Sequence, residues 1–151
     1  MSYQHITIPE GGAAITANAD NSLNVPDNPI IPFIEGDGIG IDITPVMRKV
    51  VDAVVHKAYG GDRSIAWMEI YAGQKANDLL HTWLPEESVQ ACRDYLVSIK
   101  GPLTTPGGGG FRSLNVAIRQ VLDLYSCIRP VKWYGASSPL VRPQQMDLVI
   151  F

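Results

Sequence analysis

The stretch PIIPFIEGDGIGIDITP, residues 29–45, restricts the fold more than any other part of the chain. Its apolar run, residues 30–34, is typical of a buried strand, and the glycines after it are typical of a tight turn. Thr44 fits a helix N-cap and Pro45 the first helical position, where a missing N–H costs nothing. The pattern predicts a strand, a glycine turn and a helix that ends at Gly60 and Gly61. Within this helix, apolar residues repeat at helical spacing at Val46, Val50, Ala53, Val54 and Ala58.

Further apolar runs alternate with helical patterns along the rest of the chain. The sequence predicts strands at residues 64–71, 96–100, 126–134 and 146–151, and helices at residues 84–95 and 113–125. Residues 1–29 are rich in asparagine, aspartate and glycine, and we expect a surface loop or the edge of a hairpin there. Strands that alternate with helices predict an α/β fold with a substantially parallel sheet.

Composition and charge exclude several functional classes. Hydrophobic residues make up 46% of the chain and charged residues 18%, as in soluble globular proteins. The net charge of −3 offers no basic surface for nucleic acid. No apolar run approaches the roughly 18 residues that a membrane-spanning helix needs. The N-terminus lacks the layout of a secretion signal, so we expect a cytoplasmic protein with no nucleic-acid or membrane partner.

Neither the cysteines nor the histidines predict a reactive or metal-binding site. Cys92 and Cys127 form no C-x-x-C motif, and we expect both to be small buried hydrophobic residues. His5, His56 and His81 lie far apart in the sequence, which favours structural or solvent-facing roles. The carboxylates are scattered as well, without a pair that would hold a divalent ion.

The motif EGDGIG, residues 35–40, invites comparison with a dinucleotide-binding turn. Its spacing is G-x-G-x-G and not G-x-G-x-x-G, and no acidic residue ends a second strand about 20 positions later. We therefore interpret it as a tight turn from strand to helix near a ligand, in which Asp37 fits a turn-forming role equally well.

The strongest chemical signal is TTPGGGGFRSLNVAIRQ, residues 104–120. Four glycines leave the backbone open to a ligand, and the helix N-terminus that follows attracts anions. Ser113 stands where a hydroxyl can cap the helix or bind a ligand oxygen. At 100° per residue, Arg112, Asn115 and Arg119 share one face beside an apolar stripe, and Arg129 can converge from the next strand. The stripe comprises Leu114, Ile118, Val121, Leu122 and Tyr125.

Guanidinium groups in such a cluster suit carboxylates or phosphates, which they bind through paired hydrogen bonds. The residues alone therefore predict a site for a small anion, either a phosphate or a polycarboxylate. The alternative is a solvated basic face whose arginines pair with Asp123 or with glutamates elsewhere.

These segments resemble one enzyme family. KGPLTTPGGGGFRSLNVAIRQVLDLYSCIRPVKWY, with NVPDNPIIPFIEGDGIGIDITP upstream, is similar to the β-decarboxylating dehydrogenases, over residues 23–151. IEGDGIG and KGP belong to the whole superfamily, whereas RSLNVAIRQ is similar to the bacterial NADP-dependent members that act on isocitrate. Members that act on isopropylmalate carry apolar residues where Ser113 and Asn115 stand. The resemblance implies the non-Rossmann fold of this family.

The resemblance also implies roles for individual residues. Ser113 and Asn115 would bind the carboxylate particular to isocitrate, and Arg119 and Arg129 would clamp the remaining carboxylates. Lys100 would be a further basic residue of the substrate pocket. A second pair, Thr104 and Thr105, would contact the nicotinamide half of NADP.

The implied reaction is oxidative decarboxylation of isocitrate to 2-oxoglutarate and CO₂ in the tricarboxylic acid cycle, with reduction of NADP and assistance from Mg²⁺ or Mn²⁺. We expect the catalytic residues and the metal ligands to lie beyond residue 151, so that this chain is an inactive N-terminal fragment. Residues 1–124 would form part of a large domain, and residues 125–151 the start of a small one. Homodimers are implied, and so is phosphorylation of Ser113 by a dedicated kinase/phosphatase.

Two alternatives remain at this stage. The chain could be a segment of an isopropylmalate or homoisocitrate dehydrogenase, or a truncated, non-catalytic module that binds a polycarboxylate. The choice of NADP over NAD rests on overall similarity alone.

Overall fold

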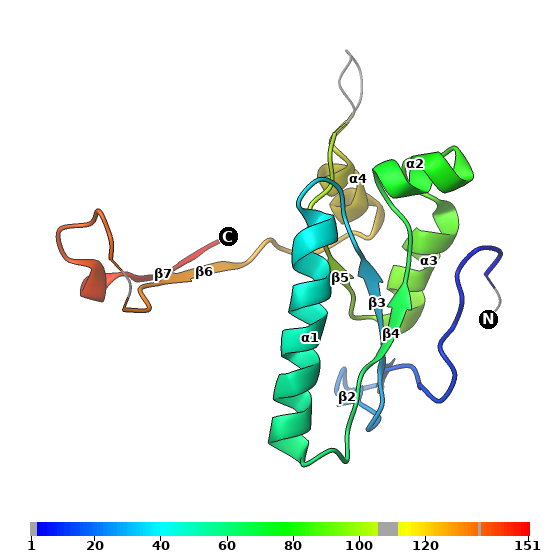
Figure 1. Ribbon diagram of the computed structural model, residues 1–151, viewed down its shortest axis with the longest axis horizontal. Helices are drawn as coiled ribbons and strands as arrows, with labels where there is room; N and C mark the ends of the chain where they lie inside the picture. Colours follow the sequence, from blue (N-terminus) through cyan, green and yellow to red (C-terminus); the bar gives the residue numbers. More distant parts are fainter. Residues whose placement is uncertain (1–2, 106–111, 136) are drawn as a thin grey trace.

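A three-stranded parallel sheet forms the centre of the computed structural model, which describes residues 3–105, 112–135 and 137–151 (Figure 1). The middle strand β3 (Ile30–Ile34) pairs with β4 (Ala66–Glu69) on one side and with β5 (Ile99–Lys100) on the other. All five residues of β3 are buried, as the apolar run predicts for the central strand of a parallel sheet. The predicted α/β class is confirmed. The glycine run at residues 107–110 lies outside the described residues.

Helices cover both faces of this sheet. On one face, α1 (Gly40–Tyr59) places the Arg48 guanidinium 4.5 Å from the centre of the Phe33 ring. On the other face, α3 (Glu86–Tyr95) and α4 (Leu114–Val121) supply Ala91, Leu114 and Ile118 to a core that includes Ile30 and Ile34. The alternation of side chains along β3 thus gives each face its own layer, as Figure 1 shows for α1 and α3.

The start of α1 differs from the prediction. The helix begins at Gly40, so Pro45 lies inside it and Thr44 does not cap it. The Thr44 hydroxyl instead donates to the backbone oxygen of Glu35 at 2.7 Å, which ties the helix to the turn before it. The helix ends as predicted, at Gly60 in the left-handed conformation (φ 63°).

The apolar stripe of α1 faces away from the sheet. Val46, Val50 and Val54 are each more than half exposed, although their spacing is helical. The side of α1 that contacts the sheet carries Thr44 and Arg48, whose guanidinium lies over Phe33 and also 5.6 Å from the Trp67 ring. The Arg48 guanidinium, stacked on two aromatic rings, therefore packs against the sheet at a position where the sequence pattern predicts an aliphatic side chain.

Two further helices differ from the prediction. The sequence pattern predicts no helix at α2 (Gln74–Leu80), which follows Gly73 and ends at His81 in a left-handed conformation. The helix predicted for residues 113–125 ends at Val121, and Asp123 has φ of 51°, a conformation that cannot continue a helix. The end of the predicted stripe, Tyr125, is consequently fully exposed.

The last two predicted strands lie outside the parallel sheet. A two-stranded antiparallel ribbon is formed by β6 (Arg129–Lys132) and β7 (Asp147–Ile150), with the short 3₁₀ helix η1 (Pro143–Gln145) between them. This ribbon projects from the body of the molecule (Figure 1). A second ribbon near the N-terminus, β1 (Thr16–Ala17) with β2 (Leu23–Asn24), fits the predicted hairpin edge. The predicted domain boundary at residues 124–125 stays a prediction.

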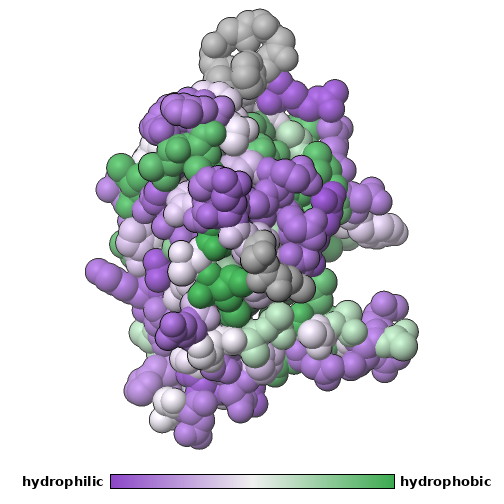
Figure 2. All heavy atoms as spheres, turned by 90° about the vertical axis from the view of Figure 1, so that its right-hand side faces the viewer, coloured by the Kyte–Doolittle hydropathy of each residue, from purple (hydrophilic) through white to green (hydrophobic). Residues whose placement is uncertain are grey.

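The surface that carries α2 and α3 is largely hydrophilic, with its hydrophobic groups in separate patches (Figure 2). None of the helices in the described part of the chain has the length and apolar character needed to cross a membrane. Cys92 and Cys127 are half-buried, less than the predicted buried hydrophobic residues would be, and Cys92 packs against the core. Burial nevertheless raises the pKa of the Cys92 thiol, which keeps it protonated and unreactive at neutral pH.

Candidate functional site

The loops that follow the parallel strands meet at one edge of the sheet, since the carboxyl ends of parallel strands lie together. Gly36 follows β3, and a Cβ built on it would lie 2.5 Å from the backbone oxygen of Pro102. Gly101 follows β5, and a Cβ there would overlap the backbone oxygen of Glu35. We call this junction between residues 35–37 and 101–104 the glycine seam. Only glycine allows the two backbones to approach so closely.

Backbone hydrogen bonds close the glycine seam. The Asp37 N–H donates to the Pro102 oxygen at 2.7 Å, and the Gly101 N–H donates to the Ile34 oxygen at 2.8 Å. The loop after β5, which includes Thr104, is therefore fixed against the loop after β3.

The Asp37 side chain adds a second link at the same place. The residue is only 8% exposed. Its Oδ1 accepts a hydrogen bond from the Gln74 N–H at 2.8 Å, and its Oδ2 accepts one from the Thr104 N–H at 2.8 Å. The carboxylate thus joins the turn after β3, the start of α2 and the loop after β5. Its partners lie 37 and 67 positions away, so the sequence could suggest only a turn-forming role.

Two residues of the predicted basic cluster, Asn115 and Arg119, lie near Lys100 at the end of β5. The Lys100 ammonium donates to Asn115 Oδ1 and to the Gly101 oxygen, both at 2.7 Å. The Asn115 amide in turn donates to the Leu103 oxygen at 3.3 Å. This network fixes the Asn115 side chain against the loop after β5 and leaves one ammonium proton of Lys100 for another partner.

Lys100, Asn115 and Arg119 line one groove of about 550 Å³ between the end of α3 and α4. Asn115 and Arg119 are four residues apart on α4, so they point to the same side of the helix, as the predicted spacing requires. Arg93 of α3 lines the groove too, and its guanidinium donates to the Val121 oxygen at 2.7 Å. The groove therefore combines basic side chains with an amide.

The charges in this groove repel one another. Burial lowers the pKa of Lys100, and the nearby Arg119 cation lowers it further, against a smaller opposite effect of Asp37. Within the described ranges, neither Lys100 nor Arg119 has a carboxylate within 4.0 Å. Two cations without a counterion favour an anionic ligand, because binding it would relieve their repulsion.

The other predicted site residues lie outside this groove. Ser113 is the residue before α4, is half-buried, and caps the helix with its backbone only, since its hydroxyl makes no hydrogen bond to a described residue. Thr104 and Thr105 are exposed at the end of the loop after β5. Arg129 starts the projecting ribbon and is exposed. Their assignments to substrate and cofactor stay predictions.

Arg112 does not share a face with Asn115 and Arg119. It precedes the first residue of α4, and its guanidinium donates to Gln120 Oε1 at 2.8 Å. The prediction that it belongs to the same helix face is wrong, because the helix starts one residue after the serine.

One ionic cluster near the glycine seam was not predicted. The Lys75 ammonium contacts Glu35 at 2.9 Å and also binds Glu69, which lies at the end of β4. Burial alone would lower the pKa of Lys75, but the hydrogen bonds from its ammonium to these carboxylates outweigh this effect and raise it. Sequence spacing offers no signal for this cluster, whose members come from three separate elements.

Metal ligands do not cluster in the part of the chain that the structure describes. No group of three histidine, cysteine, aspartate or glutamate side chains there could hold an ion. His5 binds Glu87 through its ring at 2.7 Å, and His81 closes α2. The described residues therefore do not fit a Mg²⁺ or Mn²⁺ site, and we assign them no metal-dependent step.

The chain is similar in sequence to known isocitrate dehydrogenases. The model of the isocitrate/isopropylmalate dehydrogenase family matches residues 30–151. The isocitrate dehydrogenase [NADP] of Pseudomonas aeruginosa is 66% identical over 154 aligned residues, which cover 100% of this chain and 37% of that protein. The isocitrate dehydrogenase [NADP] of Helicobacter pylori is 55% identical, covering 95% of this chain and 36% of that protein.

A solved structure agrees with these matches. The crystal structure of isocitrate dehydrogenase from Methylococcus capsulatus superposes with a TM-score of 0.67 at 36% sequence identity, covering 80% of this chain and 33% of that one. The chain thus spans little more than a third of the length of the relatives that it matches.

Proposed function

Because the chain belongs to the isocitrate/isopropylmalate dehydrogenase family, we propose that it forms the substrate-binding part of an NADP-dependent isocitrate dehydrogenase. The complete enzyme would convert isocitrate to 2-oxoglutarate and CO₂ in the tricarboxylic acid cycle. The relatives from Pseudomonas aeruginosa and Helicobacter pylori are both isocitrate dehydrogenases [NADP], which supports this choice over isopropylmalate as the substrate.

One observation supports the proposal above the others: Lys100 and Arg119 line a single groove without a carboxylate partner among the described residues. The Lys100 ammonium, which hydrogen bonds hold in place, the exposed Arg119 guanidinium and the Asn115 amide would bind carboxylates of the substrate. Each charge-assisted hydrogen bond would contribute about 1.5–3 kcal/mol. We assign Arg119 and Lys100 to these carboxylates. Asn115, with Ser113 at the start of α4, would bind the carboxylate that distinguishes isocitrate.

Arg129 would add a second guanidinium to the substrate site. It stands at the start of the ribbon formed by β6 and β7, five residues past Leu124, a residue of the groove rim. With its guanidinium on the substrate, it would help to hold the reacting carbon in one orientation for hydride transfer.

For the cofactor, we propose that Thr104 and Thr105 bind the nicotinamide end of NADP. Both side chains are exposed beside the glycine seam, and their hydroxyl groups suit the carboxamide of a nicotinamide ring. NADP⁺ would accept the hydride in the complete enzyme, and a divalent cation would assist decarboxylation. Since the described residues offer no metal site, we propose that this chain alone binds substrate but does not turn it over.

Ser113 would also be a regulatory site. A phosphate adds about −1.5 to −2 charges where a substrate carboxylate must bind, so its modification would repel isocitrate. The half-buried hydroxyl makes no hydrogen bond to a described residue, which leaves it available to a kinase/phosphatase. We also expect the complete enzyme to be a homodimer and to act in the cytoplasm.

Calorimetric titration of isocitrate and of isopropylmalate into this chain tests the proposal. We expect isocitrate to bind more tightly, and Arg119→Met to weaken it about tenfold or more, since one charge-assisted hydrogen bond is lost. Lys49→Met on α1 is the matched control, because Lys49 is exposed and lies outside the groove. Circular dichroism checks that each variant is folded.

Three results would contradict the proposal. Tighter binding of isopropylmalate would assign the chain to another member of the family. An equal loss in Lys49→Met and Arg119→Met would mean that general charge, and not the groove, attracts the ligand. Formation of NADPH by the 151-residue chain with isocitrate and Mg²⁺ would show that the chemistry does not need further residues.

A further inference from the structure

The Asp37 carboxylate connects the loop after β5, which carries Thr104 and Thr105, to the start of α2. It is buried, and each of its oxygens accepts one backbone N–H, from Gln74 and from Thr104, both at 2.8 Å. No lysine, arginine or histidine in the described part of the chain forms an ion pair with it. Its charge is therefore compensated by backbone dipoles at these two positions.

We propose that Asp37 is a positioning residue for the cofactor, which holds Thr104 and Thr105 in the place where the nicotinamide end of NADP binds. The proposal rests on the proposed function of these two threonines. Asp37 itself is buried behind the loop and does not need to touch the cofactor.

Close contact with the backbone of Gly73 restricts the position of the Asp37 carboxylate. A Cβ built on Gly73 would overlap both carboxylate oxygens, so the side chain lies directly against the backbone before α2. Its own N–H donates to the Pro102 oxygen at 2.7 Å, two residues before Thr104. The loop after β5 is thus fixed at Pro102 by the backbone of Asp37 and at Thr104 by its side chain.

Hydrogen bonds that do not involve Asp37 hold Lys100 and Gly101, at the start of the same segment. Lys100 belongs to β5, which pairs with β3, and the Gly101 N–H donates to the Ile34 oxygen at 2.8 Å. Loss of the Asp37 carboxylate would therefore release Thr104 and Thr105, whereas Lys100 keeps its place in β5 and its hydrogen bond to Asn115. This predicts a specific weakening of cofactor binding, whereas general destabilisation would weaken both ligands.

Nuclear magnetic resonance on this chain tests the idea in two steps, with Asp37→Asn as the variant. The first step measures hydrogen exchange of the Gln74 and Thr104 amides. Asparagine keeps one acceptor oxygen and no charge, so one amide loses its acceptor and the other keeps only a neutral hydrogen bond. We expect about tenfold faster exchange at both, and unchanged exchange at the core residue Ile70. Asp42→Asn, at an exposed carboxylate in the first turn of α1, is the matched control and should change neither amide.

The second step titrates NADP⁺ and isocitrate separately and follows the amides of Thr105 and Asn115. We expect Asp37→Asn to weaken NADP⁺ binding about fivefold to tenfold and to change isocitrate affinity less than twofold. An equal loss for both ligands, or an unchanged affinity for NADP⁺, would overturn the positioning role.

The two steps separate this inference from the proposed function. Unchanged exchange at Thr104 in Asp37→Asn would refute the link itself, whatever the ligand does. If NADP⁺ shifts neither threonine amide in the unmodified chain, the proposed cofactor contact fails and the positioning role falls with it. The exchange data would then still show whether Asp37 holds the loop.

Discussion

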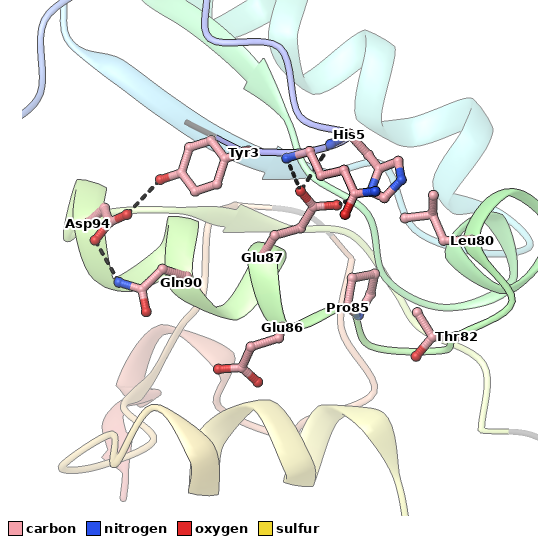
Figure 3. A pocket seen from close by; sticks show the side chains of 10 residues that line it. Tyr3, His5, Leu80, Thr82, Pro85, Glu86, Glu87, Gln90 and Asp94 are labelled. Atoms are coloured by element: carbon pink, nitrogen blue, oxygen red, sulfur yellow. Dashed lines mark hydrogen bonds and ion pairs between the residues drawn. The ribbon is translucent and has the colours of Figure 1, made fainter. Parts of the chain in front are cut away.

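Two carboxylates of α3 fix the N-terminal segment. Asp94 accepts a hydrogen bond from the Tyr3 hydroxyl at 2.7 Å, and the second carboxylate, Glu87, allows a sharp test of the structure. Glu87 accepts hydrogen bonds from the backbone N–H groups of Gln4 and His5, at 2.9 and 3.0 Å, and contacts the His5 ring at 2.7 Å (Figure 3). The Glu87 side chain is only 16% exposed. Replacement of Glu87 by glutamine leaves one acceptor oxygen and removes the charge.

The size of the effect follows from these contacts. A hydrogen bond to a charged group contributes about 1.5–3 kcal/mol, and a neutral one about 0.5–1.5 kcal/mol. Glu87→Gln loses at least one charged hydrogen bond and weakens the others, so we expect the free energy of opening this segment to fall by about 1.5–3 kcal/mol. This corresponds to roughly 10-fold to 150-fold faster hydrogen exchange of the Gln4 and His5 amides.

The neighbouring Glu86 provides the control. Its side chain is 83% exposed and lies 3.8 Å from Arg93, so Glu86→Gln should change the opening free energy by no more than about 0.5 kcal/mol. The reasoning is refuted if both variants change the two amides equally, or if exchange in Glu87→Gln matches that of the unmodified chain.

The same contact predicts a dependence on pH. Burial alone would raise the pKa of Glu87, but the hydrogen bonds from His5 and Gln4 outweigh it, and the net shift is downward. A carboxyl group with a lowered pKa stabilises the folded state above its unfolded pKa and loses this effect as the pH falls through its folded pKa. Protection of the Gln4 amide should therefore decrease in acid, and this decrease should be absent from Glu87→Gln.

Three further predictions concern the core and the groove. Ile70→Ala, at a side chain that is 1% exposed, should lower the free energy of unfolding by about 2–5 kcal/mol in urea titrations. Val50→Ala, on the outer face of α1, should lower it by less than about 1 kcal/mol. Similar losses in the two variants would contradict the observed orientation of α1. Ser113→Asp should weaken isocitrate binding in calorimetry far more than Ser113→Ala, and equal effects would argue against charge repulsion as the regulatory principle. Because the pKa of Lys100 is lowered, isocitrate affinity should fall as the pH rises through that pKa, and Lys100→Arg should remove this dependence.

The central part of the fold was predictable because each signal there is local. An apolar run gives β3, a glycine with a positive φ ends α1, and the long crossover connections between parallel strands are usually helical. The orientation of α1 was not predictable from its pattern. Helical periodicity shows which residues share a face, but not what that face contacts, and here Arg48 and not Val50 faces the sheet.

The candidate site was predictable to the same extent. Asn115 and Arg119 are four residues apart, so their shared orientation follows from helix geometry, and the groove contains both. The end of α4 was missed because Asp123 adopts a left-handed conformation that no apolar spacing reveals. The role of Asp37 was missed because its partners are distant in sequence and are backbone groups, which carry no residue-specific signal.

In the proposed site, the glycine seam joins the residues assigned to the substrate to those assigned to the cofactor. Thr104 lies in the loop that directly follows Lys100 of β5. The end of β3 binds this loop at Gly101, and Asp37 after β3 binds it at Pro102 and Thr104. Hydride transfer needs the two reacting groups in van der Waals contact, so the proposed function requires the groups that bind substrate and cofactor to be held at a fixed distance from each other. A side chain on Gly101 would separate the two loops and move both sets of groups. In the proposed site, Gly101 is therefore required by the distance between the substrate and cofactor residues, and not only by the close approach of its backbone to Glu35.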